Sequence, residues 1–310
     1  MCFRSDLRQT TSVQKSRVAW IAGEALMDLI PVLDGKRVPM VGGGPANTAK
    51  AVARLGYPTF FLGGISTDGY GRAIDMELRE SGVDLSLVYR GNEPTALAIA
   101  TIDENGLAKY EFDLDGTASF AFNNSWLPQG EPDVIHVGSV ATMLEPGASE
   151  LLKWISIKSA PVVFDPNVRP SIQSDKEIYR SAVERWIDVV SIVKLSEDDI
   201  SWLYGDENVL HSWLARGVSL IIVTRGDKGL TAISNGFSID IPAESISVVD
   251  SVGAGDTIGA VIVEGVLKYG LSGLSGENLI KVLERAVRAA AITCSRAGAN
   301  PPWKAELDKP

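Results

Sequence analysis

Short apolar segments alternate along this chain with segments that carry the periodicity of amphipathic helices. The apolar segments are rich in β-branched residues and read VAWIAG, TFFLGG, DVIHVGS, PVVFDP, VVSIVK and SLIIVTRG. Each of them precedes or follows about 10–15 residues of helical pattern, which indicates β-α-β units. Strands of this kind form mainly parallel sheets with helices on both faces. We therefore expect an α/β fold in which a mainly parallel central sheet lies between two layers of helices.

One region departs from this alternation. Between Pro94 and Phe112, two segments with strand-like alternation flank the residues Asp-Glu-Asn-Gly at 103–106. Asn-Gly between two such segments is a strong signal for a β-hairpin. A hairpin inserted into an α/β domain is a candidate lid, and we expect the segment from Leu29 to Met40 to add strands to it.

The rest of the chain shows no repeat and no boundary of a second domain. We expect a single domain over residues 18–306, with lid segments inserted at about 29–40 and 93–115. Residues 1–17 are basic, rich in Ser and Thr and without an apolar stretch, so they do not resemble a secretory signal. We interpret them as a disordered tail.

Composition excludes several classes of site. The net charge of −10 argues against non-specific nucleic-acid binding, and no apolar run approaches the ~18 residues of a membrane span. Cys2 and Cys294 are the only cysteines, so we expect no disulfide framework, no thiolate metal site and a cytoplasmic location. We expect His136 to be buried and hydrogen-bonded and His211 to be on the surface. Histidine-based zinc sites and Ser-His-Asp catalysis are therefore disfavoured.

The loop SVGAGDT lies between a β-branched run and a helical segment. Ligands of open α/β sheets bind at such loops, outside the carboxyl ends of the strands. The backbone N–H groups of Gly253, Ala254 and Gly255 can converge on an anion, and the following helix adds the positive end of its dipole. Asp256, beside a bound phosphate, suits a general base for an attacking hydroxyl. The alternative is that Asp256 only caps the helix. Because the start of a helix stabilises a negative charge, we expect the pKa of Asp256 to be lowered.

A second glycine loop reads VGGGPANTAKAVARLG. Gly42 to Gly44 allow the backbone to approach a ligand, Pro45 suits the first turn of a helix, and Asn47 offers a donor and an acceptor. A plain flexible turn is the alternative. The stretch is a near miss of the phosphate-binding P-loop, because it lacks the glycine before Lys50 and the Ser or Thr after it. We expect Lys50 to be a solvated or packed charge in a helix.

Taken with three further segments, these loops resemble the PfkB family of carbohydrate kinases, which includes ribokinase and the fructokinases. GGGPAN is similar to the N-terminal sugar-loop signature of the family, and DSVGAGDTIGA to its C-terminal signature, usually D-T-x-G-A-G-D. VTRGDKG resembles the nucleotide loop, and DPNVR and KLSED also fit. The resemblance runs in family order from about Val18 to Trp303. It implies a ribokinase-like three-layer α/β/α sandwich with a small β-strand lid.

The resemblance also implies cofactors and residue roles. The cofactors are ATP as phosphoryl donor, Mg²⁺ and, as an activator, K⁺. Arg169 is a candidate for neutralising phosphate charge, with a structural ion pair as the alternative. The other matching positions are Asp256 for the catalytic base; Gly253, Ala254 and Gly255 for the anion hole; Asp28, Gly43, Gly44 and Asn47 for the sugar; Thr224, Gly226 and Gly229 for the nucleotide; Glu197 for magnesium through water; and Asp250 with the carbonyls of Val252, Arg296 and Gly298 for a monovalent cation.

Departures from the family pattern bear on the substrate. Ribokinases carry a lysine in place of Gly44 and a glutamate near the end of the strand that reads HVGS here, so ribose is disfavoured. Where the family usually has Thr-Thr or Thr-x after the first aspartate, this chain has Ser251-Val252. The backbone carbonyl of Val252 can still serve as a ligand of the monovalent cation. The usual asparagine of the KLSED segment is Lys194, which weakens the prediction for magnesium.

The lid sequence separates two candidate substrates. The stretch KYEFDLDGTASF contributes Glu111, Asp113 and Asp115, and its one cation, Lys109, is expected on the same face as Glu111. An acidic lid suits a neutral sugar better than the carboxylate of 2-keto-3-deoxygluconate. We therefore expect a fructokinase-like enzyme that phosphorylates the terminal primary hydroxyl of a hexose, fructose first, with 2-keto-3-deoxygluconate as the alternative.

Two functions from other classes are disfavoured. A sugar sensor derived from a kinase would have lost Asp256 or the glycine loop, and both are present. A dinucleotide-binding oxidoreductase needs G-x-G-x-x-G after the first strand, where this chain reads GEALMD. The partners that we expect are a small sugar and ATP, with a possible homodimer through the lid.

Overall fold

The computed structural model of the chain describes residues 16–32, 36–102 and 108–309. Its centre is an eight-stranded sheet in the order β14-β13-β12-β11-β10-β9-β1-β4. The strands from β12 to β4 pair in parallel, and β13 and β14 join antiparallel. Their bounds are β1 Ala19–Ala22, β4 Thr59–Leu62, β9 Val134–Gly138, β10 Val162–Asp165, β11 Ile192–Ser196, β12 Leu220–Thr224, β13 Leu230–Ser234 and β14 Phe237–Ile241.

Helices cover both faces of this sheet, because its strands are apolar on both sides. In β12, Leu220 and Ile222 belong to one buried core, and Ile221 and Val223 belong to the other. The first core is closed by α1 Gly44–Arg54, α2 Gly69–Glu80, α7 Ala254–Tyr269, α8 Gly276–Cys294 and α9 Lys304–Leu307. The second is closed by α3 Gly147–Ile155, α4 Lys176–Ile187, α5 Glu197–Tyr204 and α6 Asn208–Ala215.

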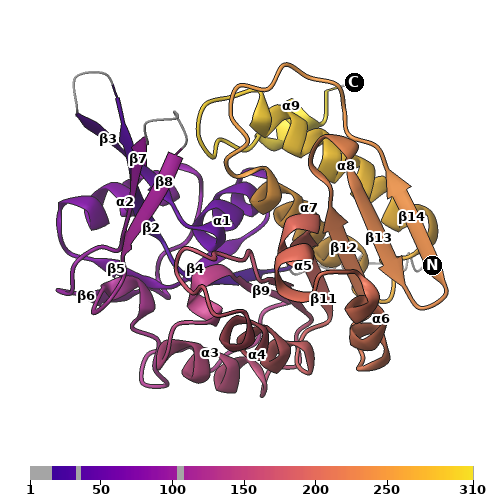
Figure 1. Cartoon of the computed structure of the whole chain (residues 1–310), viewed down its shortest axis with the longest axis horizontal. Helices are drawn as coiled ribbons and strands as arrows, with labels where there is room; N and C mark the ends of the chain where they lie inside the picture. Colours follow the sequence, from indigo (N-terminus) through magenta and orange to yellow (C-terminus); the bar gives the residue numbers. More distant parts are fainter. Residues whose placement is uncertain (1–15, 33–35, 103–107, 310) are drawn as a thin grey trace, which may run out of the picture.

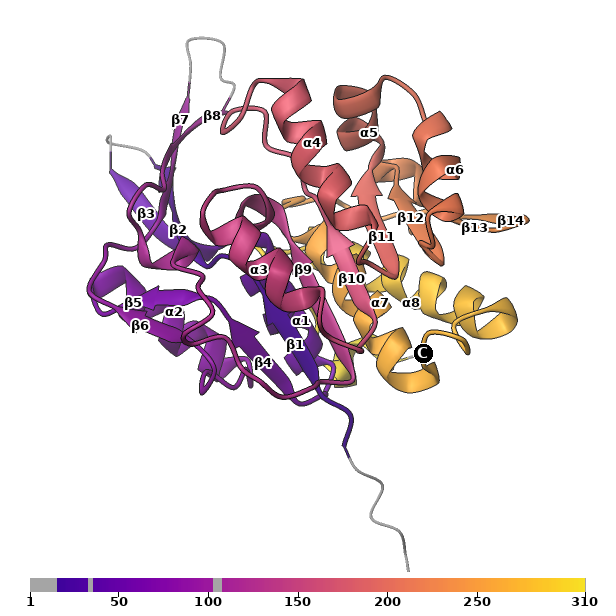
Figure 2. The same cartoon turned by 90° about the horizontal axis from the view of Figure 1, so that it is seen from below.

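Figure 2 shows this arrangement, with α4, α5 and α6 on one side of β10–β12 and α7 and α8 on the other. The predicted three-layer α/β/α architecture with a mainly parallel sheet is confirmed. Short 3-10 turns follow some strands, at η3 Ser139–Thr142 and η4 Gly226–Lys228, and η2 Ala118–Phe120 precedes β9.

A second sheet, of four strands, packs against α2 and lies to one side of the central sheet (Figure 1). Its order is β3-β2-β7-β8, with bounds β2 Leu26–Pro31, β3 Arg37–Gly42, β7 Leu97–Ile102 and β8 Ala108–Asp113. β7 and β8 form the expected antiparallel pair, and β2 and β3 add strands to it as expected. The Asn-Gly turn predicted at 103–106 lies outside the described residues. A small parallel pair, β5 Gly64–Ser66 and β6 Tyr89–Gly91, lies nearby. We call the four-stranded sheet the lid sheet.

The predicted tail, residues 1–17, lies outside the described residues except for its last two. Of these, Arg17 donates a hydrogen bond to the carbonyl oxygen of Leu267 at 2.6 Å. The division into one domain over 18–306 with inserted lid segments stays a prediction. Within the described ranges, no helix has both the length and the apolar character that crossing a membrane requires.

The two histidines differ from each other as expected, with one correction. His211 is exposed on α6, and His136 in β9 is 2% exposed. The prediction that His136 is hydrogen-bonded is wrong, because neither of its ring nitrogens has a partner among the described residues. Burial and the nearby ammonium of Lys194 lower the pKa of His136 to about 3, so the ring is neutral.

Candidate active site

One cleft, of about 670 Å³, collects most of the residues that the sequence singled out. It lies between a face of the lid sheet and loops that follow β1, β9 and β10, which supply Glu24, Ser139 and Asn167 to its lining. This is the carboxyl edge of a parallel sheet, where ligands are expected. The predicted residues that line it are Asp28, Gly43, Gly44, Asn47, Arg169, Asp250, Val252, Gly253, Gly255, Asp256 and Gly298. The predicted residues outside its lining are Ala254, Thr224, Gly226, Gly229, Glu197 and Arg296.

The glycines of the GAG loop are required for two different reasons. Gly253 is the N-cap of α7 and has φ +79°, a left-handed conformation, and a β-carbon there would lie 2.6 Å from Cβ of Ala299. Gly255 is helical, but a β-carbon on it would lie 2.8 Å from Nζ of Lys194. The N–H groups at the start of α7 have no acceptor within the helix. That of Ala254 donates to the carbonyl oxygen of Ser251 at 3.3 Å, and those of Gly255 and Asp256 are suited to an anion in the cleft.

Asp256 stands on the first turn of α7 and is 9% exposed. Helix α7 has no side-chain cap, so the structure does not support the interpretation of Asp256 as an N-cap. Its Oδ2 accepts a hydrogen bond from Nδ2 of Asn47 at 2.9 Å. This bond joins the two glycine loops, which lie far apart in the sequence.

Burial raises the pKa of Asp256, and the negative charge of Asp165 raises it further. Lys194, the Asn47 hydrogen bond and Arg169 lower the pKa by less than this. The expectation of a lowered pKa is therefore wrong, because the loss of hydration and the charge of Asp165 outweigh the lowering effects of these three groups. A buried carboxylate with a raised pKa holds a proton more readily than an exposed aspartate.

The sugar-loop residues line the cleft directly beside Asp256. Asn47 is 6% exposed, and its Oδ1 has no hydrogen-bond partner among the described residues, so it can accept one from a ligand. A β-carbon on Gly44 would lie 2.9 Å from Nδ2 of Asn167 and 3.2 Å from Oδ1 of Asp256. Close approach of the chain at Gly44 thus leaves only a narrow space beside Asp256. Pro45 lies in the first turn of α1, as expected.

Asp28 reaches the cleft from β2 of the lid sheet, where it pairs in register with Met40 and Ala98. Burial raises its pKa to about 6, against the lowering effects of Arg169 and Lys50. The carboxyl group therefore changes its charge close to neutral pH, and it does so inside the candidate sugar site.

The expectation that the acidic residues of the lid face the substrate is wrong. Successive side chains of a strand point to opposite faces, and in β8 it is Tyr110 and Phe112 that line the cleft. Glu111 and Asp113 are exposed and do not line it. The side chain of Lys109 lies outside the described residues. The lid therefore presents aromatic rings to the cleft.

Asp250 ties together the two loops predicted to hold a monovalent cation. Its Oδ1 accepts from the N–H of Val252 at 3.0 Å, and its Oδ2 from the N–H of Gly298 at 2.8 Å.

Lys50, expected as a solvated or packed charge, is 2% exposed. Its Nζ pairs with Glu77 at 2.6 Å and donates to the carbonyl oxygen of Ala299 at 3.1 Å. The side chain of Arg296 pairs with Glu306 instead of facing the cleft.

The predicted nucleotide residues lie together at the ends of β11 and β12. Thr224 ends β12, Gly226 begins the 3-10 turn that follows, and Gly229 comes directly after that turn. Glu197 begins α5 next to them; it accepts a hydrogen bond from Arg225 at 2.9 Å and pairs with Lys228 at 3.7 Å. Within the described ranges, no group of three or more His, Cys, Asp or Glu residues is arranged to hold a metal ion.

Two residues that the sequence reasoning missed also shape the cleft. Glu24 is 1% exposed, and its Oε2 accepts from the N–H of Ala141 at 3.1 Å, which fixes the turn η3. Ser139 in that turn has a positive φ of 58°, unusual for a residue with a side chain. The signal for Glu24 was an acid directly after a buried strand.

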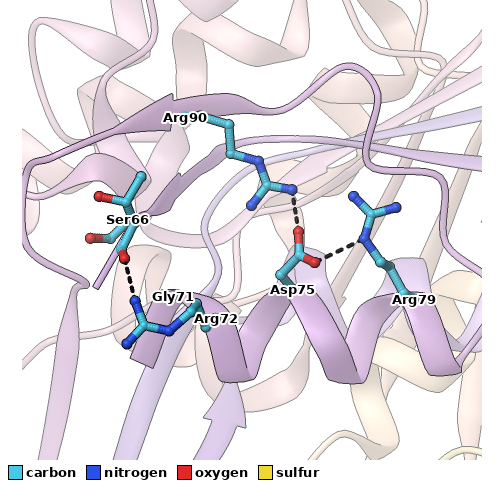
Figure 3. Close-up of a pocket in the computed structure, with 7 residues that line it drawn as sticks. Ser66, Gly71, Arg72, Asp75, Arg79 and Arg90 are labelled. Carbon is cyan, nitrogen blue, oxygen red and sulfur yellow. Dashed lines mark hydrogen bonds and ion pairs between the residues drawn. The ribbon is translucent and has the colours of Figure 1, made fainter. Parts of the chain in front are cut away.

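A second hollow, of about 490 Å³, lies along α2 and shares no lining residue with the cleft. Figure 3 shows that its arginines are already engaged. Arg79 and Arg90 both pair with Asp75, and Arg72 donates to the carbonyl oxygen of Thr67 at 2.7 Å. Because these arginines are already paired within the chain, we take the cleft, and not this hollow, as the candidate active site.

Comparisons with known proteins agree with this geometry. The family model of the pfkB family carbohydrate kinases matches residues 20–306. The chain belongs to this family. A fructokinase of Rhizobium leguminosarum bv. trifolii is 34% identical to this carbohydrate kinase over 251 residues, 77% of each chain. The Escherichia coli fructokinase is 28% identical over 306 residues, 94% of this chain and 99% of the relative.

Solved structures of two fructokinases share the fold. The fructokinase from Vibrio cholerae O395, in its fructose, ADP and calcium ion bound form, has a TM-score of 0.83 at 24% identity and covers 94% of this chain and 97% of that one. The fructokinase from Xylella fastidiosa with bound ATP has a TM-score of 0.85 at 24% identity, with the same coverage. The predicted ribokinase-like fold of this carbohydrate kinase is confirmed.

Asp28 gives a testable pH dependence. The ionised carboxylate accepts stronger hydrogen bonds from sugar hydroxyls than the protonated group does, and the pKa of Asp28 is about 6. We therefore expect the sugar KM to rise as the pH falls below about 6. Asp28→Asn should raise the sugar KM by about 10–100-fold, the value of hydrogen bonds to a charged group, and should flatten this dependence. Asp113→Asn, on the exposed face of the same lid sheet, is the control. An Asp28→Asn enzyme with an unchanged sugar KM at neutral pH contradicts the assignment.

Proposed function

We propose that this carbohydrate kinase transfers the γ-phosphoryl group of ATP to the terminal primary hydroxyl of a hexose, fructose first, to give fructose 6-phosphate. The observation that carries the proposal is the position of Asp256, which lies on the first turn of α7 and lines the same cleft as Asp28 and Asn47. A proton acceptor, an anion-binding helix start and acceptors for sugar hydroxyls thus share one cavity. The fructokinase relatives support the choice of sugar.

In the mechanism that we infer, Asp256 is the general base. Asn47 donates a hydrogen bond to Oδ2 of Asp256. The other carboxylate oxygen of Asp256, Oδ1, lies beside Gly44, and there it takes the proton of the attacking sugar hydroxyl. The raised pKa helps this step, since a base of higher pKa accepts a proton more readily. The backbone N–H groups at Gly253, Ala254 and Gly255, with the helix dipole, stabilise the charge on the phosphoryl group.

Charge and shape of the cleft favour a neutral sugar. Among the described lining residues, four acids face two cations: Glu24, Asp28, Asp250 and Asp256 against Arg169 and Lys194. Lys194 is already paired with an aspartate. A carboxylate such as that of 2-keto-3-deoxygluconate would meet this acidic excess with Arg169 as its main counter-charge. Tyr110 and Phe112 offer apolar surface for the carbon face of a hexose ring.

The nucleotide is assigned to the loop at Thr224, Gly226 and Gly229, from which its phosphates would reach the start of α7. The described residues lack a carboxylate cage for magnesium, which suits an ion held mainly by nucleotide phosphates with Glu197 acting through water. Bound there, magnesium would neutralise phosphate charge. Arg169 lines the cleft, but its Nη1 also donates to the carbonyls of Asn167 and Val168, so a structural role stays open beside phosphate neutralisation.

An ADP-release assay across several acceptors tests the substrate. We expect fructose to give the highest kcat/KM among fructose, ribose, 2-keto-3-deoxygluconate and nucleosides, because the cleft has acceptors for hydroxyls and an excess of acids. Product analysis should place the phosphate on the terminal carbon. A kcat/KM for 2-keto-3-deoxygluconate above that of every neutral sugar would overturn the assignment.

Potassium activation is a second prediction from the same site. We assign a monovalent cation to Asp250 and the carbonyls of Val252, Arg296 and Gly298, where it would hold the GAG loop in shape without touching the substrate. The Asp250 hydrogen bonds to both loops support this assignment. The rate in potassium should exceed the rate in a large organic cation several-fold at matched ionic strength. Equal rates in the two salts would refute the cation site.

A further inference from the structure

A buried ion pair lies directly behind the start of α7. Nζ of Lys194, on β11, is 2.8 Å from Oδ2 of Asp165, at the end of the neighbouring strand β10. Each side chain is 5% exposed. A buried pair of this kind contributes little to stability in general, because desolvation offsets the attraction. Its position in the site therefore calls for a role other than holding the fold together.

The ammonium of Lys194 is turned toward the anion-binding loop. Its Nζ is so close to Gly255 that a β-carbon on this glycine would lie 2.8 Å away from it. Lys194 also lines the cleft. An ammonium has three donors, and Asp165 is its only hydrogen-bond acceptor among the described residues. Lys194 therefore keeps donor capacity and positive charge on the side of the cleft where a phosphoryl group would bind.

We infer that Lys194 is a positioning residue for phosphoryl transfer: it places a fixed positive charge behind the Gly253–Gly255 anion hole, and Asp165 holds it there. The inference rests on the proposed function and deepens it. Transfer gathers negative charge on the phosphoryl oxygens, and a cation buried near them acts with little screening by solvent. Lys194 acts on the phosphoryl group through the electrostatic field of its charge and through the position of the Gly253–Gly255 loop.

A second effect of Lys194 must be separated from the first. Its charge also lowers the pKa of Asp256, whereas Asp165 raises that pKa. The other charged groups that face Asp256 are Arg169, after β10, and Asp28, on the lid sheet. His136, next to Lys194, is neutral. Removal of Lys194 alone should therefore alter both the anion hole and the ionisation of the base.

The test compares Lys194→Met with the double variant Asp165→Asn/Lys194→Met in pH profiles of kcat. In Lys194→Met, the acid limb should move to higher pH, and the plateau above it should fall by about 10–100-fold, the scale of losing one oxyanion contact or somewhat less. In the double variant, the limb should return toward the wild-type position, because the opposing influence of Asp165 is also gone. The plateau should stay within about threefold of that of the single variant.

Recovery of the wild-type plateau in the double variant would overturn the inference, because it would show that Lys194 only neutralises Asp165. A Lys194→Met plateau within about twofold of the wild type would overturn it as well. Lys194→Gln, which keeps a donor for Asp165 but no charge, serves if methionine prevents folding, and the same plateau loss is expected. A wild-type protein that phosphorylates none of the sugars would instead refute the proposed function itself.

Discussion

The hydrogen bond from Asn47 to Asp256 joins the two halves of the site, and most of the local structure follows from it. Nδ2 of Asn47, in the first turn of α1, lies 2.9 Å from Oδ2 of Asp256, in the first turn of α7, across 209 positions of the sequence. Two helix starts can approach this closely only where side chains are small. Gly44 meets that need, because a β-carbon on it would lie 3.2 Å from Oδ1 of Asp256, and Gly253 adds the backbone conformation that starts α7.

Burial of the base has a cost and a benefit for a phosphoryl-transfer site. Dehydration disfavours the ionised form of Asp256, and the neighbouring Asp165 adds to this effect. The same dehydration makes every charge in the cleft act more strongly on its neighbours. Lys194 and Asn47 lower the pKa of Asp256 and so stabilise its ionised form in part. This allows the carboxylate to act as a base next to a negatively charged phosphoryl group.

The sequence predicted the features that depend on local pattern. Alternating strand and helix periodicity was sufficient for the layers, and the two glycine loops were sufficient for the cleft, because parallel strands end at one edge of the sheet. What it could not supply was the outcome of packing. The strands of the lid were placed correctly, but which residues of β8 face the cleft depends on how the sheet sits, so Tyr110 and Phe112 were missed in favour of Glu111 and Asp113.

Burial of charge was the other limit. Lys50 and Lys194 look like ordinary lysines in the sequence, yet both are almost fully buried. Lys50 donates to the carbonyl oxygen of Ala299 in a loop of the site, and Lys194 pairs with Asp165 at the end of β10. The pKa of Asp256 was expected to be low from the helix start alone, since the degree of its dehydration is a property of the closed cleft. The sequence also did not indicate that both ring nitrogens of the buried His136 would lack a hydrogen-bond partner among the described residues.

The turnover number of Asp256→Asn is the most direct measurement of the central claim, that Asp256 removes the proton from the sugar hydroxyl. The substitution keeps the shape and the contact with Asn47 but removes basicity. The kcat should fall by about 10²–10⁴-fold, the usual contribution of a general base. Nucleotide affinity should stay the same or rise, because a negative charge near the γ-phosphate is gone. A kcat within about threefold of the wild type would show that Asp256 is not the base.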